Sequence, residues 1–140
     1  MQFVPQRGLV ALTAVLDIAI NASKQPISAR TLADRYGLAP RYLEPLLQML
    51  VHVGILKGIR GPQGGYQLGR PSSTLTAAEI VRATQESSRV SYPPIKKYPL
   101  VAKIILPGLE KPERAITEAL QAVTIDTLLR RASAVGLRKD

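Results

Sequence analysis

Residues 40–68 restrict the fold of this chain more than any other stretch. Leucines recur there at the spacing of one helical face, at Leu43, Leu46, Leu47 and Leu50. Two short apolar segments follow, 55–60 and 66–68, and between them lies a glycine-rich turn, Gly61-Pro62-Gln63-Gly64-Gly65. The order of helix, strand, glycine turn and returning strand predicts a winged helix-turn-helix. This is a mainly α-helical fold whose small β-hairpin forms the wing.

A second helix is predicted just before this stretch, so that the two form a helix-turn-helix pair. It would run from Ser28, a residue type that favours the N-cap, to Tyr36 and end at Gly37. A short turn then leads to Pro40, which suits the first position of a helix because an N–H there has no intrahelical partner. The second helix of such a pair enters the DNA major groove with its N-terminus first.

The rest of the chain predicts further helices over 8–21, 77–85, 100–122 and 124–131, and a loop over 86–99. The first helix is apolar nearly all round, so we expect a subunit interface to cover its second side. Pro107 and Pro112 predict a kink or a break in the helix over 100–122. We therefore divide the chain into a winged helix-turn-helix DNA-binding domain, residues 1–86, and a loop with a C-terminal helical dimerisation region, residues 87–140.

The charge of the chain favours a polyanionic partner. Lys and Arg number 19 against 10 Asp and Glu, a net charge of +9. A solvated basic surface without a partner is the alternative. With no cysteine and one histidine, His52, the chain has no nucleophile–base pair and no metal-ligand cluster, so we expect no enzyme, metal or cofactor. Because no apolar run reaches the ~20 residues of a membrane span, we expect a cytoplasmic protein.

The polar face of the helix after Pro40 supplies the first candidate DNA-binding residues: Arg41, Tyr42, Glu44 and Gln48. Arg41 and Gln48 are candidates for base contacts, because arginine pairs with guanine and glutamine with adenine through two hydrogen bonds. Tyr42 is a candidate for a phosphate or sugar contact. Glu44 leaves three alternatives open: it accepts from cytosine, repels the phosphates of unsuitable sequences, or pairs with Arg41. An ordinary solvated helix face is the alternative for the whole set.

The wing and the start of the helix at Ser28 supply the other candidates. Glycines let the wing backbone approach a phosphate or enter the minor groove, where Arg60 adds positive charge. Ser28 and Arg30 lie near a helix N-terminus, which favours a phosphate, although capping alone explains Ser28 equally well. A plain hairpin turn is the alternative for the wing. The DNA-binding candidates of these two segments are Ser28, Arg30, Arg60, Gly61, Gln63, Gly64, Gly65 and Tyr66.

Two motifs make the chain similar to a known family. Tyr42-Leu43-Glu44 opens the leucine-rich helix, and Arg60-Gly61-Pro62-Gln63-Gly64-Gly65-Tyr66 forms the wing. This pattern resembles the Rrf-two family of bacterial transcription regulators, closely over residues 8–86 and more loosely over 123–128. The resemblance implies a DNA-binding regulator, a specificity role for Glu44, and a homodimer joined by a long crossed helix. Such a dimer would bind double-stranded DNA at a palindromic operator. A winged-helix module that binds proteins is the alternative.

Several regulators of this family hold an iron–sulfur cluster largely through cysteines in the loop before the C-terminal helix. The corresponding segment here, ESSRVSYPPIKKYP, contains none. A serine hydroxyl stays protonated where a thiol would ionise, so it is a poor ligand for iron. We therefore expect neither a thiolate-held cluster nor thiol-based sensing. Binding would be constitutive or controlled by a small-molecule effector, with Tyr92 and Tyr98 as candidate effector residues; a solvated loop is the alternative for this segment.

Overall fold

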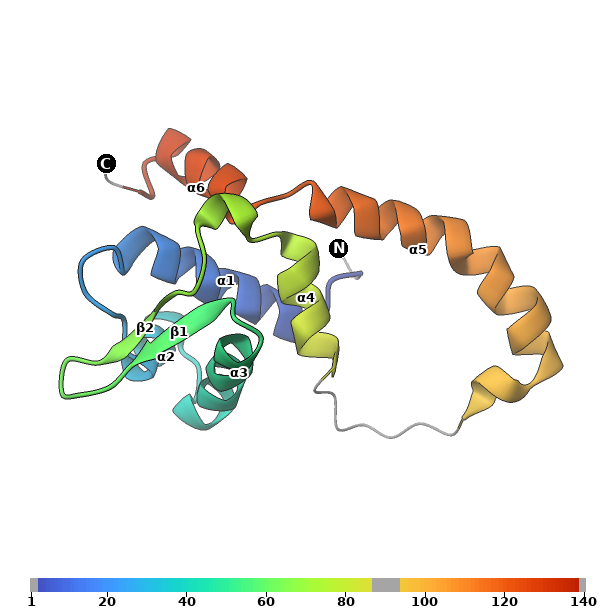
Figure 1. The fold of residues 1–140 in the computed structure, drawn as a ribbon, viewed down its shortest axis with the longest axis horizontal. Helices are drawn as coiled ribbons and strands as arrows, with labels where there is room; N and C mark the ends of the chain where they lie inside the picture. The colour runs from blue at the N-terminus through green and yellow to red at the C-terminus, as the bar shows by residue number, and fades with distance from the viewer. Residues whose placement is uncertain (1–2, 87–93, 139–140) are drawn as a thin grey trace.

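The computed structural model describes residues 3–86 and 94–138, which form a helical body with one β-hairpin and one long helix that leaves the body (Figure 1). Along the chain the elements are α1 (Gln6–Asn21), α2 (Ala29–Tyr36), α3 (Pro40–His52), β1 (Leu56–Ile59), β2 (Gly65–Leu68), η1 (Ser72–Thr74), α4 (Ala77–Glu86), η2 (Ile95–Lys97), η3 (Val101–Ile105), α5 (Leu106–Gln121) and α6 (Ile125–Ala134). The predicted fold class, mainly α-helical with a small hairpin wing, is confirmed. The predicted N-cap at Ser28 forms, since Ser28 Oγ accepts the Thr31 N–H at 3.1 Å. Thr124 caps α6 in the same way, because its Oγ1 accepts the Thr127 N–H at 3.0 Å.

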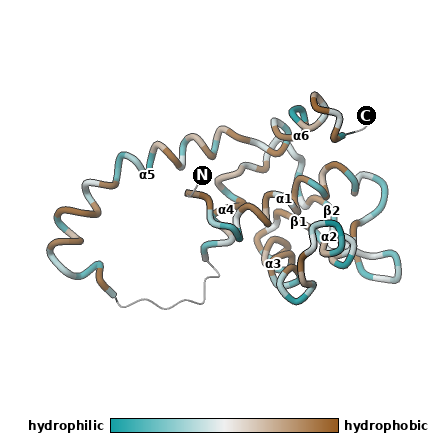
Figure 2. The backbone as a smooth tube through the Cα atoms, turned by 180° about the vertical axis from the view of Figure 1, so that it is seen from behind, coloured by the Kyte–Doolittle hydropathy of each residue, from teal (hydrophilic) through white to brown (hydrophobic). Residues whose placement is uncertain are grey.

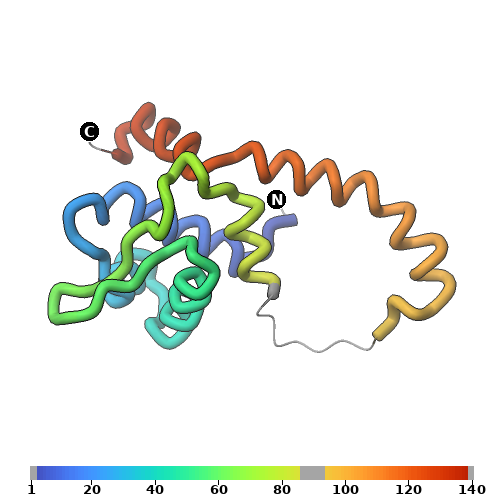
Figure 3. The backbone as a smooth tube through the Cα atoms, in the orientation of Figure 1, coloured from blue at the N-terminus to red at the C-terminus, as the bar shows by residue number. Residues whose placement is uncertain are grey.

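α1 is the central helix of the body. It packs against α4, α6 and β2, and Figure 3 shows it running between the hairpin and the C-terminal segment. Ala11, Val15 and Ile18 are buried there and join a core cluster with the leucine face of α3. Helices of the same chain therefore cover sides of α1 that the sequence led us to assign to a subunit interface.

The C-terminal helix α6 completes this core. Ile125 and Leu129 are buried in the same core cluster as residues of α1, α3 and α4, and α6 packs against α1 and η1. A backbone hydrogen bond also joins the start of α4 to the segment before α6, because the Ala77 N–H donates to the Val123 carbonyl at 2.8 Å. The division of the chain into two regions stays a prediction, but α6 shares the core of the first region although it was assigned to the second.

The helix after η2 begins irregularly and is exposed over most of its length. Pro107 lacks the N–H that would donate to the Lys103 carbonyl. The residues before it form the π-helical turn η3, in which the Leu106 N–H donates to the Val101 carbonyl. The helix is thus irregular before Pro107, whereas α5 continues through Pro112 without the predicted break. Neither η3 nor α5 contains a buried residue, and apolar segments recur along both (Figure 2). Among the described residues, no helix is both long and apolar enough to cross a membrane.

Candidate nucleic-acid interface

α3 presents the predicted polar face to solvent. Arg41, Tyr42, Glu44 and Gln48 are all exposed. The leucines of the opposite face are buried in the core: Leu43, Leu46, Leu47 and Leu50. In the described part of the chain Arg41 and Glu44 form no ion pair with each other. The first turn of α3 therefore offers a cation, a phenol and a carboxylate to a partner.

The wing is a two-stranded antiparallel hairpin in which Ile59 pairs with Gly65 and Lys57 with Gln67. Figure 1 shows it extending out from the body beside α2, with α3 below the strands. Arg60 and Gln63 at its tip are exposed. The tip therefore combines a positive charge, an amide and glycine backbone, which suits contact with phosphates.

Two glycines of the wing stand where no side chain fits. A Cβ on Gly64 would lie 2.2 Å from the Ile59 carbonyl oxygen, and a Cβ on Gly65 would lie 2.4 Å from the Ile27 carbonyl oxygen. Gly65 also has a φ of 155°, which L-residues rarely adopt. The Gly-Gly pair of the motif thus permits a tight turn and a close approach of the wing to the segment before α2.

Tyr66 joins the wing to both helices of the helix-turn-helix. Its N–H donates to the Ile27 carbonyl at 2.8 Å, and its carbonyl accepts the Ile27 N–H at 3.0 Å, directly before the α2 N-cap Ser28. Its hydroxyl accepts a hydrogen bond from Gln48 Nε2 on α3 at 2.9 Å. The tyrosine itself is only 8% exposed. Tyr66 and Gln48 are thus hydrogen-bonded to each other. Direct contact of either residue with DNA stays a prediction.

The start of α2 lies beside this connection. Ser28 is half-buried and caps α2, whereas Arg30 is exposed on the first turn. The exposed set of the interface is thus Arg30 on α2, Arg41, Tyr42, Glu44 and Gln48 on α3, and Arg60, Gly61 and Gln63 on the wing. These residues come from three elements that the contacts of Tyr66 bring together.

A buried carboxylate, which the sequence analysis did not identify, fixes α2 on α1. Asp17 is only 4% exposed. Its oxygens accept hydrogen bonds from Arg35 Nη1 at 2.5 and 2.6 Å and from the Tyr36 hydroxyl. Burial, together with the hydrogen bond to Asp17, raises the pKa of Tyr36 to about 12, and the same carboxylate raises the pKa of Arg35. An acidic residue within an apolar helix was the available indication of such a pairing.

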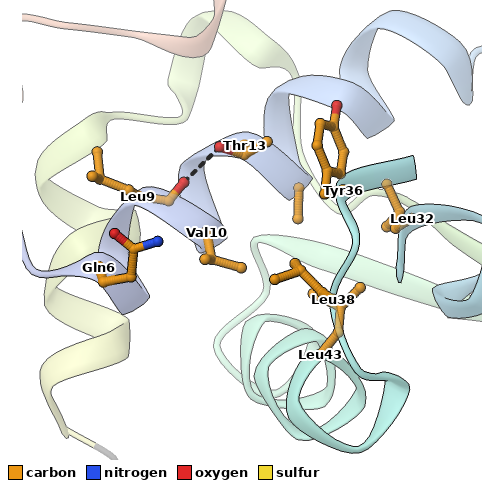
Figure 4. Close-up of a pocket in the computed structure, with 9 residues that line it drawn as sticks. Gln6, Leu9, Val10, Thr13, Leu32, Tyr36, Leu38 and Leu43 are labelled. Atoms are coloured by element: carbon orange, nitrogen blue, oxygen red, sulfur yellow. Dashed lines mark hydrogen bonds between the residues drawn. The ribbon is translucent and has the colours of Figure 1, made fainter. Parts of the chain in front are cut away.

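A small apolar pocket opens between α1 and the helix-turn-helix pair (Figure 4). Its volume is about 170 Å³, and Leu9, Val10, Leu38 and Leu43 are among its lining residues. No charged side chain lines it. The pocket therefore lacks the positive charge that favours a phosphate, and we do not assign it to the candidate interface.

Comparison with known proteins places this arrangement in a family. A family model described as an iron-dependent transcriptional regulator, Rrf2, matches residues 4–131. The chain belongs to the Rrf2 family. The resemblance seen in the motifs is confirmed, and the members of the Rrf2 family described below are regulators rather than enzymes.

Relatives of the Rrf2 type are found among curated sequences and solved structures. The chain is 42% identical over 85 residues to a helix-turn-helix type transcriptional regulator of Haemophilus influenzae, covering 61% of this chain and 57% of that one. It is 37% identical over 81 residues to the regulator IscR of Escherichia coli, covering 58% and 50%. The chain thus spans about half the length of the curated relatives it matches.

Solved Rrf2-type structures match nearly the whole chain. IscR of T. potens superposes with a TM-score of 0.76 at 27% identity, covering 98% of this chain and 93% of that one. CymR (YrzC), the global cysteine regulator of B. subtilis, gives a TM-score of 0.71 at 26% identity, covering 94% and 98%.

The residues present do not fit the iron implied by the family description. The sequence contains no cysteine, and the described residues contain no group of three or more His, Asp or Glu side chains that could hold a metal ion. His52, the only histidine, is exposed at the end of α3. Of the candidate effector residues, Tyr92 lies outside the described residues. Tyr98 is 55% exposed, with Lys97 Nζ 5.5 Å from the centre of its ring.

Proposed function

We propose that this regulator binds double-stranded DNA, with α3 in the major groove and the wing in the adjacent minor groove. The observation that carries the proposal is that the exposed polar turn of α3 and the basic glycine tip of the wing are joined through one buried residue, Tyr66. The net charge of +9 supports a polyanionic partner. Because its relatives are bacterial regulators, whose DNA lies in the cytoplasm, we place the protein there.

The candidate residues other than Gln48 and Tyr66 have chemically suited roles in this complex. Arg41 pairs with guanine through two hydrogen bonds, and Glu44 accepts from a cytosine amino group or rejects other sequences by repelling phosphates. Tyr42, Arg30 and Ser28 contact the sugar-phosphate backbone, the last two beside the N-terminus of α2. Arg60 and Gln63 follow the minor groove together with the backbone of Gly61, Gly64 and Gly65.

A homodimer on a palindromic operator follows from the exposed long helix. Large apolar side chains along it are exposed: Leu100, Ile104, Ile105, Leu106, Leu109 and Ile116. Contiguous apolar surface of this kind marks an interaction site. A second copy of the chain, related by twofold symmetry, would cover the helix and present two α3 helices to two half-sites.

We also propose that DNA binding here needs no iron–sulfur cluster, because the chain supplies no thiolate ligand. Serine hydroxyls in the segment before α5 do not replace such ligands at neutral pH. Binding is then constitutive or controlled by a small molecule near Tyr98. Anaerobic incubation with iron and sulfide should leave the protein colourless; iron that stays bound after desalting, with visible absorbance, would contradict this.

Titration of the protein against duplex DNA at several salt concentrations tests the main proposal. An operator found by genomic footprinting should bind more tightly than a shuffled duplex of the same length. The logarithm of the binding constant should fall linearly with the logarithm of salt, by about 0.9 for each phosphate neutralised. Equal affinity for both duplexes, or a flat response to salt, would exclude a sequence-specific DNA-binding function.

A further inference from the structure

We infer that Gln48 is a positioning residue, which sets the wing relative to α3 through Tyr66, rather than a residue that contacts a base. The inference rests on the proposed DNA-binding function, and it concerns how two grooves are recognised together. It replaces the prediction from the sequence, in which the exposed glutamine pairs with adenine.

The first support is the set of bonds around Tyr66. Its backbone is paired with Ile27 in both directions, at 2.8 and 3.0 Å, and this pairing fixes β2 against the segment before α2. Tyr66 is buried, so its hydroxyl has little freedom to turn toward solvent. Gln48 Nε2 donates to that hydroxyl at 2.9 Å. One residue of the wing therefore makes directional bonds to both helices of the pair.

The second support is the position of Gln48 on α3. It lies eight residues after Pro40, about 12 Å along the helix axis at 1.5 Å per residue. A recognition helix that enters the major groove with its N-terminus first contacts the bases through residues near its start, where Arg41 and Glu44 are exposed. Gln48 lies further along α3 and lines an open surface pocket of about 470 Å³ between α3 and the wing, with Ile59, Arg60 and Tyr66.

This bond matters because a two-stranded hairpin on its own is only marginally stable. The orientation of the wing relative to α3 therefore depends on its contacts with the rest of the protein. A wing that pivots relative to α3 cannot enter the minor groove while α3 occupies the major groove. Losing the bond should therefore weaken binding to every operator variant by the same factor. Losing a base contact would instead relax the preference at one base pair.

A double-mutant cycle on DNA affinity separates the two roles. We expect Gln48→Ala and Tyr66→Phe each to weaken operator binding between about two- and tenfold, the range set by one hydrogen bond. The double variant should be no weaker than either single one, and single-base-pair operator variants should keep their rank order. Gln67→Ala is the matched control, since its bond at the wing root goes to the Ala22 carbonyl. Its effect should multiply with that of Tyr66→Phe.

A measurement without DNA distinguishes failure of this inference from failure of the proposed function. The chain has no cysteine, so Arg41→Cys and Gln63→Cys allow spin labels on α3 and the wing tip alone. The distribution of distances between the labels should broaden in Gln48→Ala and Tyr66→Phe, and stay narrow in Gln67→Ala. Unchanged distances, multiplying effects of the two variants, or relaxed preference at one base pair in Gln48→Ala alone would each overturn the inference. Wild-type protein that binds no specific DNA, with broadened distances in the variants, would contradict only the proposed function.

Discussion

Asp17 shows how a single charged residue can be stable inside an apolar helix. Its carboxylate is buried, but Arg35, Tyr36 and Asn21 all donate hydrogen bonds to it. Arg35 remains partly exposed, with 40% of its side chain accessible. Removing one partner of a buried charge is costly because the other charge is left unpaired. The cluster therefore sets the position of α2, and with it the start of the helix-turn-helix.

Stability should fall at high pH because of Tyr36. Folding raises its pKa from 10.0 to about 12, so the neutral phenol stabilises the fold fully below pH 10.0, and this contribution is lost as the pH rises through about 12. Urea unfolding in buffers spanning these two values should show a smaller decline for Tyr36→Phe than for the wild type. Tyr42→Phe, at an exposed tyrosine on α3, is the matched control and should follow the wild type. Parallel curves for all three proteins would disprove this role.

Gly65→Ala should destabilise the protein. The added Cβ would lie 2.4 Å from the Ile27 carbonyl oxygen, so the backbone pairing between the wing and the segment before α2 must open. We expect a loss of about 1–3 kcal/mol in the free energy of unfolding, the usual range for a strained backbone position. Gly58→Ala is the control, because no heavy atom lies within 4 Å of a Cβ there. Equal stability of the two variants would show that the close approach has no energetic consequence.

At the scale of elements, the wing and α3 work as one unit because they are connected by packing and by hydrogen bonds. The chain runs from α3 directly into β1, and Ile55 and Leu56 are buried in the core. Tyr66 then joins the returning strand to α2 and α3. The wing tip beyond Ile59 is exposed. Its orientation is set by these contacts at the root of the hairpin.

Arg60→Ala should weaken binding to all duplexes by a similar factor and lower the salt slope by about one, if Arg60 meets a phosphate. Lys57→Ala removes the same charge from β1, where Lys57 lines a surface pocket with Ile18 and Ala22. We expect this control to keep the wild-type slope. Titrations at three or more salt concentrations decide the result. Equal slopes for both variants would place the wing tip away from the DNA backbone.

At the scale of the whole molecule, the protein combines a closed core with an open helix. α6 returns to the core beside α1, whereas η3 and α5 contribute no buried residue. Figure 2 shows apolar segments along α5, and Leu109 and Ile116 among them are exposed. A folded chain with this much exposed apolar surface is expected to associate.

Ile104→Glu with Leu109→Glu should convert the proposed dimer into a monomer. Both side chains are exposed on the long helix, 64% and 47%, and a carboxylate in an apolar interface is strongly unfavourable. Lys111→Glu places a carboxylate at an exposed polar position of the same helix and should remain dimeric. Sedimentation velocity at micromolar concentration measures both. A wild-type monomer, or a dimer that survives the double substitution, would rule out α5 as the dimer interface.

The helices, the wing and the polar face of α3 could be predicted from the sequence, because these depend on residues close together in the chain. The spacing of Leu43 to Leu50 specifies one face of a helix, Ser28 and Thr124 cap helices within three residues, and adjacent glycines permit the tight turn of the wing. The family motif followed from the same local features, and the match over residues 4–131 agrees with it.

Which distant residues become partners could not be predicted from the sequence and depends on the packing of the helices. Tyr66 looks like an exposed motif residue in the sequence, yet it is buried against Ile27 and Gln48. Asp17 has several basic residues available along the chain, and only the packing of α2 on α1 selects Arg35. Likewise α6 joins the core because α1 leaves a face for Ile125 and Leu129. Such pairings depend on how whole helices are placed in space, and a local pattern of residues does not contain that information.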